Sequence, residues 1–222
     1  ATVRPRSAFW LRIAAKALDG GGGVLAYNFF PNNGDMVIDS ADSFFNSTSN
    51  NSRRLRNVVA HEHGHGMGFS HVCPTNSTKL MEPFASTAFD MIQLDDIQAG
   101  QRNYGDYLEP NDSSGAASPI GSFSIGTSTD VDTVSIDDNS DIDFYSLTTT
   151  QPMELTITVT PAAGTYLNGP QNGNGSCSSG TLTNYNDNQD LSIEVRSSNG
   201  TTQLAFGDSA PAEQVETLSV TL

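Results

Sequence analysis

The stretch HEHGHGMGFSH, residues 61–71, contains all four histidines of the 222-residue chain. His61 and His65 are four residues apart, so on a helix they project from the same face and can bind one metal ion. Gly68 can end that helix in a left-handed conformation, which turns the chain so that His71 approaches from a new direction. The spacing therefore predicts a metal site of three histidines with a fourth position open to water.

An open three-histidine site is typical of catalytic zinc. Zinc lowers the pKa of a bound water from about 15.7 towards 7 and polarises a substrate carbonyl. Glu62 lies beside the predicted ligands and is the candidate general base, able to take the water proton and pass it to a leaving amine. Peptide hydrolysis is the reaction that this set favours. His63 falls on another face of the helix, so we interpret it as a surface residue without a catalytic role.

The same stretch fits the HExxHxxGxxH pattern of the metzincin metalloproteases at every fixed position, and it resembles the matrixins in particular. Leu80-Met81-Glu82-Pro83 resembles the Met-turn of that family, which implies that Met81 packs beneath the zinc ligands without binding the metal. Residues 93–105, QLDDIQAGQRNYG, resemble the helix that closes the catalytic domain.

The resemblance also implies a substrate site. LAYNFFP, residues 25–31, resembles the edge strand along which an extended peptide adds as an antiparallel strand, so Leu25 and Ala26 are candidate substrate-binding residues. Pro83 is expected to help wall the pocket beside the zinc. The substrate and the cleavage preference cannot be read from these residues.

Two acidic loops resemble those that bind structural calcium in matrixins. They are DGGGG at residues 19–23 and GDMVIDSAD at residues 34–42. By position, Asp19, Asp39 and Asp42 are the implied carboxylate ligands, and oxygen ligands of this kind suit calcium. Zinc is therefore the expected catalytic cofactor and calcium the expected structural one.

The charge distribution predicts two domains. Residues 1–105 carry 9 basic and 9 acidic side chains, which leaves 1 basic and 16 acidic side chains for the rest of the chain. We expect an α+β metzincin-like catalytic domain over residues 1–106, with a twisted sheet, an active-site helix and a C-terminal helix. An all-β sandwich is expected over residues 107–222. With 60 residues before His61, the catalytic domain is expected to lack part of its amino-terminal sheet.

Local patterns predict the elements of both halves. In the first half we expect helices over residues 7–18, 52–66 and 87–101 and strands over residues 24–30 and 36–38. In the second half, strands are expected over residues 143–147, 155–160, 191–196 and 217–222. Residues 164–188, rich in Gly, Asn and Ser, are expected to form an exposed loop insertion.

The second half has a resemblance of its own. Glu109-Pro110-Asn111-Asp112, followed by DIDFYSL at residues 141–147, resembles the bacterial pre-peptidase carboxy-terminal domain, a β-sandwich appended to secreted proteases. This resemblance implies a role in secretion or in adhesion to a matrix or surface. The domain is expected to be cut short at Leu222.

Composition narrows the partners and the compartment. The formal charge of −15 argues against a nucleic-acid partner, because phosphate backbones are bound by clustered Lys and Arg. No stretch is long and apolar enough to span a bilayer, and we expect a secreted, extracellular protein. Cys73 and Cys177 permit one disulfide in an oxidising compartment or two separate thiols.

Two hypotheses for the function remain. The leading one is a secreted zinc endopeptidase that cleaves extended protein substrates. The alternative is a catalytically inactive metzincin-fold protein whose β-sandwich carries a binding or adhesion function. Glu62 discriminates between them, because an inactive relative is expected to lose the general base. A purely structural zinc site is disfavoured, since structural zinc normally has four protein ligands.

Overall fold

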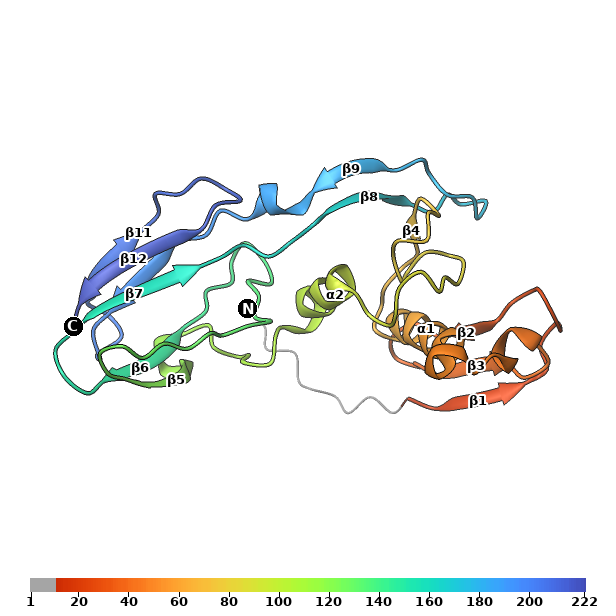
Figure 1. The fold of residues 1–222 in the computed structure, drawn as a ribbon, viewed down its shortest axis with the longest axis horizontal. Helices are drawn as coiled ribbons and strands as arrows, with labels where there is room; N and C mark the ends of the chain where they lie inside the picture. The colour runs from red at the N-terminus through yellow and green to blue at the C-terminus, as the bar shows by residue number, and fades with distance from the viewer. Residues whose placement is uncertain (1–10) are drawn as a thin grey trace. The chain divides into compact units, whose positions relative to one another are not determined.

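The computed structural model describes residues 11–222, which form two compact units (Figure 1). The histidine unit contains residues 11–100 and Tyr166–Thr183, and the carboxy-terminal unit contains Gln101–Thr165 and Asn184–Leu222. The domain boundary near residue 106 stays a prediction. Inclusion of Tyr166–Thr183 in the histidine unit was not expected from the sequence.

A small sheet forms one layer of the histidine unit. Its strands are β1 (Ile13–Lys16), β2 (Ala26–Asn28) and β3 (Met36–Asp39), in the order β1-β3-β2. β1 runs parallel to β3, and β2 runs antiparallel to it. Both predicted strands are confirmed, although the one expected over residues 24–30 is shorter than predicted. The 3₁₀ helix η1 (Ser43–Asn46) follows the sheet.

The helix predicted for residues 7–18 is wrong in its described part. Residues 7–10 lie outside the described residues, and β1 occupies the middle of residues 11–18. The apolar spacing of four fits a helix, but backbone hydrogen bonds to β3 replace the helical ones. Met36 N donates to Arg12 O at 2.8 Å and Ser40 N to Lys16 O at 3.0 Å. Pairing with a neighbouring strand thus overrides the helical propensity of this segment.

Helix α1 (Ser49–Gly66) lies against the sheet and confirms the helix predicted for residues 52–66 (Figure 1). Its first turn is irregular, because Asn50, Asn51 and Ser52 have left-handed backbone angles. The buried residues of α1 include Val58, Ala60, Glu62 and Gly64. His61 and His65 therefore sit on the last two turns of a helix whose other turns anchor it to the core.

Helix α2 (Leu94–Tyr104) begins seven residues later than the predicted start at residue 87. Met91 has a left-handed φ of 64°, which a regular helix does not accommodate. The Asp96 carboxylate then accepts a hydrogen bond from Gln93 N at 2.8 Å, three residues back, and so satisfies a backbone donor at the helix start. Neither α1 nor α2, the α-helices among residues 11–222, has the length and apolarity needed to cross a membrane.

The expectation that residues 164–188 form a loop without regular structure is wrong. This segment contains β8 (Thr165–Pro170), β9 (Thr181–Asn184) and the 3₁₀ helix η3 (Tyr185–Asn188). β8 lies between β9 and the short strand β4 (Val72–Cys73) in a three-stranded sheet (Figure 1). Cys73 and Cys177 form a disulfide, with Cα atoms 5.3 Å apart. The Gly- and Asn-rich composition reflects tight turns, while pairing partners 100 residues away are not visible in local sequence.

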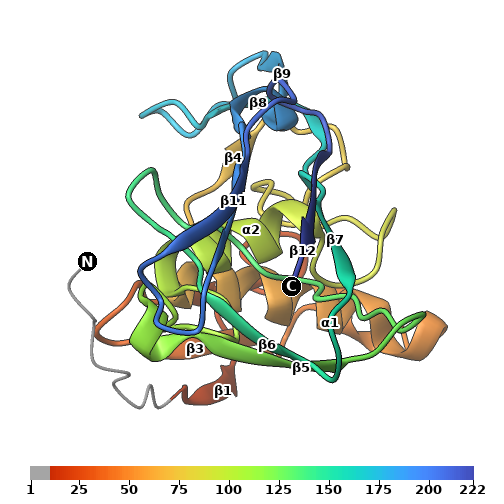
Figure 2. The ribbon, with the colours of Figure 1, turned by 90° about the vertical axis from the view of Figure 1, so that its left-hand side faces the viewer.

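Strands dominate the carboxy-terminal unit. Its elements are η2 (Ser114–Ala116), β5 (Ser118–Phe123), β6 (Tyr145–Thr149), β7 (Glu154–Val159), β10 (Ile193–Arg196), β11 (Gln203–Gly207) and β12 (Glu216–Thr221). They pair as β5–β6, β7–β12 and β10–β11. In Figure 2, β5 runs beside β6 and β7 runs beside β12. All four predicted strands are found within a few residues of their expected bounds. The all-β sandwich stays a prediction.

Asp39 fastens the first loop to the sheet. Its fully buried carboxylate accepts hydrogen bonds from the backbone N–H groups of Ala41 at 2.8 Å, Leu18 at 3.1 Å, Asp19 at 3.3 Å and Gly20 at 3.1 Å. These donors, that of Ala41 first, lower the pKa of Asp39 against the opposing effect of burial. A carboxylate bonded to four backbone donors is a structural anchor.

We predict that Asp39→Asn lowers the melting temperature at neutral pH, because an amide NH₂ would face backbone donors. A lowered folded-state pKa means that the stabilisation is complete above the unfolded pKa of about 3.9 and is lost as pH falls through the folded value. Melting curves from pH 7 to pH 3 should therefore show the gap between wild type and variant closing at acid pH. Asp35→Asn is the matched control, because the Asp35 carboxylate pairs with the exposed side chain of Arg12. A gap that does not change with pH would contradict this account.

Candidate metal centre

The end of α1 places two histidines and turns the chain towards the third. Gly68 has φ of +94°, which confirms the predicted left-handed turn. Gly68 N donates to His65 O at 2.9 Å, and Phe69 N donates to Gly64 O at 2.9 Å. This pair of bonds is a Schellman motif, which satisfies the last helical carbonyls and reverses the chain direction. The chain then leads into β4, with His71 immediately before it.

Three imidazoles converge at this point. The Nε2 atom of His71 lies 3.3 Å from that of His61 and 3.1 Å from that of His65. The ring centroids are 4.7 to 5.2 Å apart. The donor atoms of these three histidines all lie within 4.8 Å of one another. His63 is exposed on another face of the helix and does not join them, as expected.

The Nδ1 atom of each of the three rings has a hydrogen-bond acceptor. His61 Nδ1 lies 2.7 Å from Leu80 O, and His65 Nδ1 lies 2.7 Å from Phe69 O. His71 Nδ1 lies 2.8 Å from Gln171 Oε1. With the ring proton donated at Nδ1, each Nε2 keeps a lone pair that points towards the other two. Three facing lone pairs repel one another unless a cation lies between them.

The spacing fits zinc. Around a tetrahedral ion with metal–nitrogen bonds of about 2.0–2.1 Å, two nitrogen ligands lie about 3.3–3.4 Å apart. The measured Nε2 separations of 3.1 and 3.3 Å are close to that value. Three neutral nitrogen donors with oriented Nδ1 partners thus form a suitable site for zinc with one position left open.

Burial keeps two of the rings neutral. Desolvation lowers the pKa of His61 to about 4, with a hydrogen bond to Leu80 O opposing it and the neighbouring histidines adding to it. Desolvation also lowers the pKa of His65, against the hydrogen bond to Phe69 O. Because metal binding requires neutral imidazole, these rings are prepared for a metal ion at neutral pH.

Glu62 is buried one residue along the helix from His61, with 6% of its surface exposed. Burial raises the pKa of its carboxyl group to about 7, and a hydrogen bond from the backbone of Asn28 opposes that shift. Its Oε2 atom is buried without a hydrogen-bond partner. A desolvated carboxyl group with one unsatisfied oxygen beside a cluster of candidate metal ligands is typical of a catalytic acid–base residue.

Met81 packs beneath the helix between the ligands. It is buried, and its carbonyl accepts a hydrogen bond from Val72 N at 2.9 Å. A Cβ atom added to Gly64 would lie 2.5 Å from Met81 Sδ. This contact agrees with the packing role implied for Met81, and it explains a glycine in the interior of a helix, where it costs about 0.5–1 kcal/mol relative to Ala.

Glu82 fixes the loop that carries Met81. Its carboxylate is 1% exposed and accepts hydrogen bonds from four successive backbone N–H groups, those of Asn76 at 2.9 Å, Ser77 at 2.7 Å, Thr78 at 2.8 Å and Lys79 at 3.0 Å. The loop in turn presents Leu80 O to His61. Glu82 therefore acts on the metal centre through the backbone of this loop.

The sequence did not predict a role in the site for three residues, Gly64, Glu82 and Gln171. Gly64 carried a signal, because a glycine inside a predicted helix suggests close packing. Glu82 carried none of its own, since its partners are backbone groups of the preceding loop. Gln171 lies 100 residues from His71, and no local pattern connects the two.

The predicted substrate-binding residues lie on two elements. Ala26 is on β2, the edge strand of its sheet, which pairs with β3 and leaves its other side unpaired within that sheet; Leu25 precedes it. Pro83 is half-buried after Met81, and its neighbour Phe84 is 69% exposed. Their role in binding substrate stays a prediction.

The carboxylates of Asp19, Asp39 and Asp42 bind backbone groups. Asp42 accepts from Gly22 N at 3.0 Å and Phe44 N at 2.7 Å, and Asp19 accepts from Val24 N at 3.0 Å. Over residues 11–222, these three are not among the groups of metal-binding side chains whose donor atoms all lie within 4.8 Å. Calcium binding by this loop stays a prediction.

Two further features lie in the carboxy-terminal unit. Glu109, Asp141 and Asp143 bring their carboxylates together, without a histidine.

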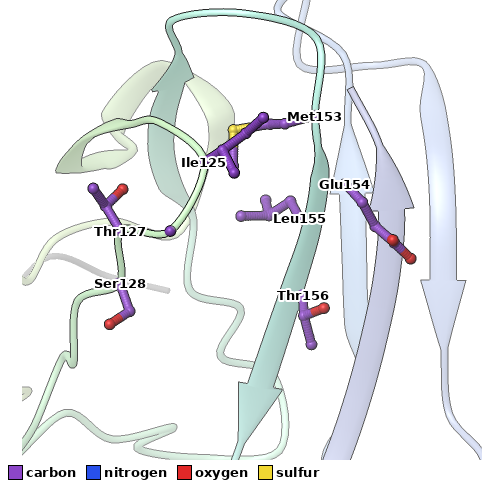
Figure 3. A pocket seen from close by; sticks show the side chains of 8 residues that line it. Ile125, Thr127, Ser128, Met153, Glu154, Leu155 and Thr156 are labelled. Carbon is purple, nitrogen blue, oxygen red and sulfur yellow. The ribbon is translucent and has the colours of Figure 1, made fainter.

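A pocket of about 500 Å³ is lined by Ile125, Gly126, Thr127, Ser128, Met153, Glu154, Leu155 and Thr156. Figure 3 shows the Glu154 side chain on the opposite side of β7 from Leu155, so the one ionisable residue of the lining points away. Neither feature offers the acid–base set found at the histidines.

Comparison with known proteins agrees with this geometry. Residues 12–105 match the family model of the matrixins. The chain is 38% identical over 91 residues to a hatching enzyme of Paracentrotus lividus and 36% identical over 107 residues to matrix metalloproteinase-18 of Xenopus laevis. It is 34% identical over 116 residues to stromelysin-3 of Mus musculus. These matches support a zinc metalloendopeptidase.

The similarity covers part of each protein. The matched regions span 40%, 46% and 50% of this chain, and 15%, 22% and 22% of the hatching enzyme, matrix metalloproteinase-18 and stromelysin-3. The chain therefore corresponds to less than a quarter of these relatives. The family match ends at residue 105, so it includes the three histidines and Glu62 but not Gln171.

We predict that Gly64→Ala destabilises the protein. The added methyl group would overlap Met81 Sδ, and overpacking of this kind costs about 1–3 kcal/mol, which outweighs the gain in helix propensity. Gly100→Ala in α2 is the control, because its nearest neighbour would lie at 3.5 Å, an ordinary contact. Urea unfolding should show a lower midpoint for the first variant and an unchanged or higher one for the second. Equal stabilities would show that Met81 does not constrain Gly64.

Proposed function

We propose that this chain is a zinc-dependent endopeptidase in which His61, His65 and His71 hold the metal and Glu62 is the general base. The observation that carries the proposal is the convergence of three Nε2 lone pairs next to a buried carboxyl group with an unsatisfied oxygen. The matrixin match over residues 12–105 supports it independently. Zinc, when bound, would polarise the substrate carbonyl and lower the pKa of the attacking water.

The protein groups supply the remaining chemistry. Glu62 accepts a proton from the attacking water at Oε2 and then donates it to the leaving amine. In the metal-free protein its pKa of about 7 lies near neutrality, which suits a group that must both accept and release a proton. The Nδ1 hydrogen bonds hold the three rings in place, so little reorganisation is needed when the metal binds.

Extended protein segments are the proposed substrates. β2 is an edge strand whose side away from β3 is unpaired within its sheet, so a peptide would add beside Leu25 and Ala26 as an antiparallel strand. Pro83 would contribute to the wall of the pocket for the residue beside the cleaved bond. This mode of binding favours unfolded or flexible segments, because a folded chain does not present a free strand.

The proposal extends to the compartment, the carboxy-terminal unit and a second metal. We propose that it is secreted, which agrees with the Cys73–Cys177 disulfide, since disulfides persist in oxidising compartments. The carboxy-terminal unit would be a β-sandwich of the pre-peptidase type that assists secretion or adhesion to a matrix. Asp19, Asp39 and Asp42 would bind a structural calcium ion.

The alternative of an inactive binding protein is less well supported. Such a protein would not need the buried carboxyl group at Glu62, since an unsatisfied buried polar atom lowers stability. Its presence is accounted for by catalysis.

We predict that the purified chain cleaves gelatin or casein, that a zinc chelator stops the cleavage, and that added zinc restores it. Glu62→Gln should reduce the rate by about 10²–10⁴-fold while the protein still binds one zinc ion, because the base is lost but the ligands remain. Glu154→Gln, on β7 of the carboxy-terminal unit, is the control and should cleave normally. One bound zinc without cleavage by the wild type would favour the binding protein instead.

A further inference from the structure

Residues Tyr166–Thr183 bring a strand from the second half of the chain to the third histidine. β8 pairs antiparallel with β4, which begins one residue after His71. The register pairs Cys73 with Gly169 and Val72 with Pro170. One further step along the two strands brings Gln171 opposite His71. The pairing of the backbones therefore decides which side chain faces the Nδ1 atom of that ring.

The amide of Gln171 is oriented by a second hydrogen bond. Its Nε2 donates to Gly175 O at 2.8 Å, across a tight turn closed by Asn172 N to Ser176 O at 2.7 Å. With the amide nitrogen used in this way, Oε1 is the atom presented to His71 Nδ1, at 2.8 Å. Because this oxygen only accepts, the Nδ1 atom must carry the proton, and the lone pair remains at Nε2.

Covalent and polar contacts hold this strand in register. The Cys73–Cys177 disulfide joins β4 to the segment that returns from the turn, where Gln171 and Cys177 form an isolated β-bridge. The buried Lys79 ammonium group donates to Leu167 O on β8. Gln171 is thus placed by backbone pairing, a disulfide and a buried cation.

The third ligand differs from the other two. His61 and His65 are oriented by backbone carbonyls from residues 80 and 69, both inside the region that matches the matrixins. His71 is oriented by a side chain outside that region. We propose that Gln171 is a positioning residue of the metal centre, which fixes the tautomer and the direction of His71 for zinc. This inference rests on the proposed zinc site.

The test compares Gln171→Met with Gln171→Glu. Methionine keeps the length and replaces the amide oxygen with a thioether sulfur, a much weaker acceptor, so the affinity for zinc, measured by competition with a chromophoric chelator, should fall by about 10- to 100-fold. Glutamate keeps the acceptor and should restore wild-type affinity or exceed it. Cobalt substituted for zinc should show an altered visible absorption spectrum in the methionine variant. The KM for a peptide should stay near the wild-type value while kcat falls.

Controls separate this inference from the proposed function. Asn172→Ala changes the same turn without touching His71, and should bind zinc as the wild type does; thiol titration confirms that the disulfide is intact in every variant. Wild-type affinity in Gln171→Met, or equally weak binding in Gln171→Met and Gln171→Glu, would overturn the positioning role. If His61→Ala binds zinc as well as the wild type, the proposed site itself fails, whatever the Gln171 variants do.

Discussion

The structure of the histidine unit depends on holding three imidazole lone pairs face to face. Neutral Nε2 atoms 3.1 to 3.3 Å apart repel one another, and the protein opposes that repulsion by fixing each ring at its Nδ1 atom. Every neighbouring element contributes to this. The Schellman turn supplies Phe69 O, the loop fastened by Glu82 supplies Leu80 O, and the turn that follows β8 supplies Gln171. A cation at the centre turns the repulsion into attraction.

The same constraint explains the packing around the site. Gly64 lacks a side chain because Met81 fills the space beneath the helix, between the turns that carry His61 and His65. Glu62 is buried on that helix, so its carboxyl group is desolvated and its pKa rises to about 7. The helix therefore presents His61, His65 and the proposed base Glu62 from neighbouring positions, while its other turns are held by the sheet.

Much of the metal centre could be predicted because its chemistry is concentrated in eleven consecutive residues. The i, i+4 spacing of His61 and His65 and the need for a left-handed residue at Gly68 follow from helix geometry. The strands of the second half were also found, since alternating β-rich segments between turns are a local signal. The helix predicted for residues 7–18 failed because strand pairing with β3 outweighed local propensity. The segment 164–188 was misjudged because its partners, β4 and His71, lie 100 residues away.

The central claim is that three histidines bind zinc and leave one position open, and X-ray absorption at the zinc edge of the metal-loaded protein tests it most directly. The account predicts three histidine nitrogens at about 2.0–2.1 Å and one oxygen from solvent, with no sulfur. In His71→Ala, one histidine nitrogen should be lost from the shell. A closed shell of four protein ligands, or a shell unchanged in that variant, would contradict the account.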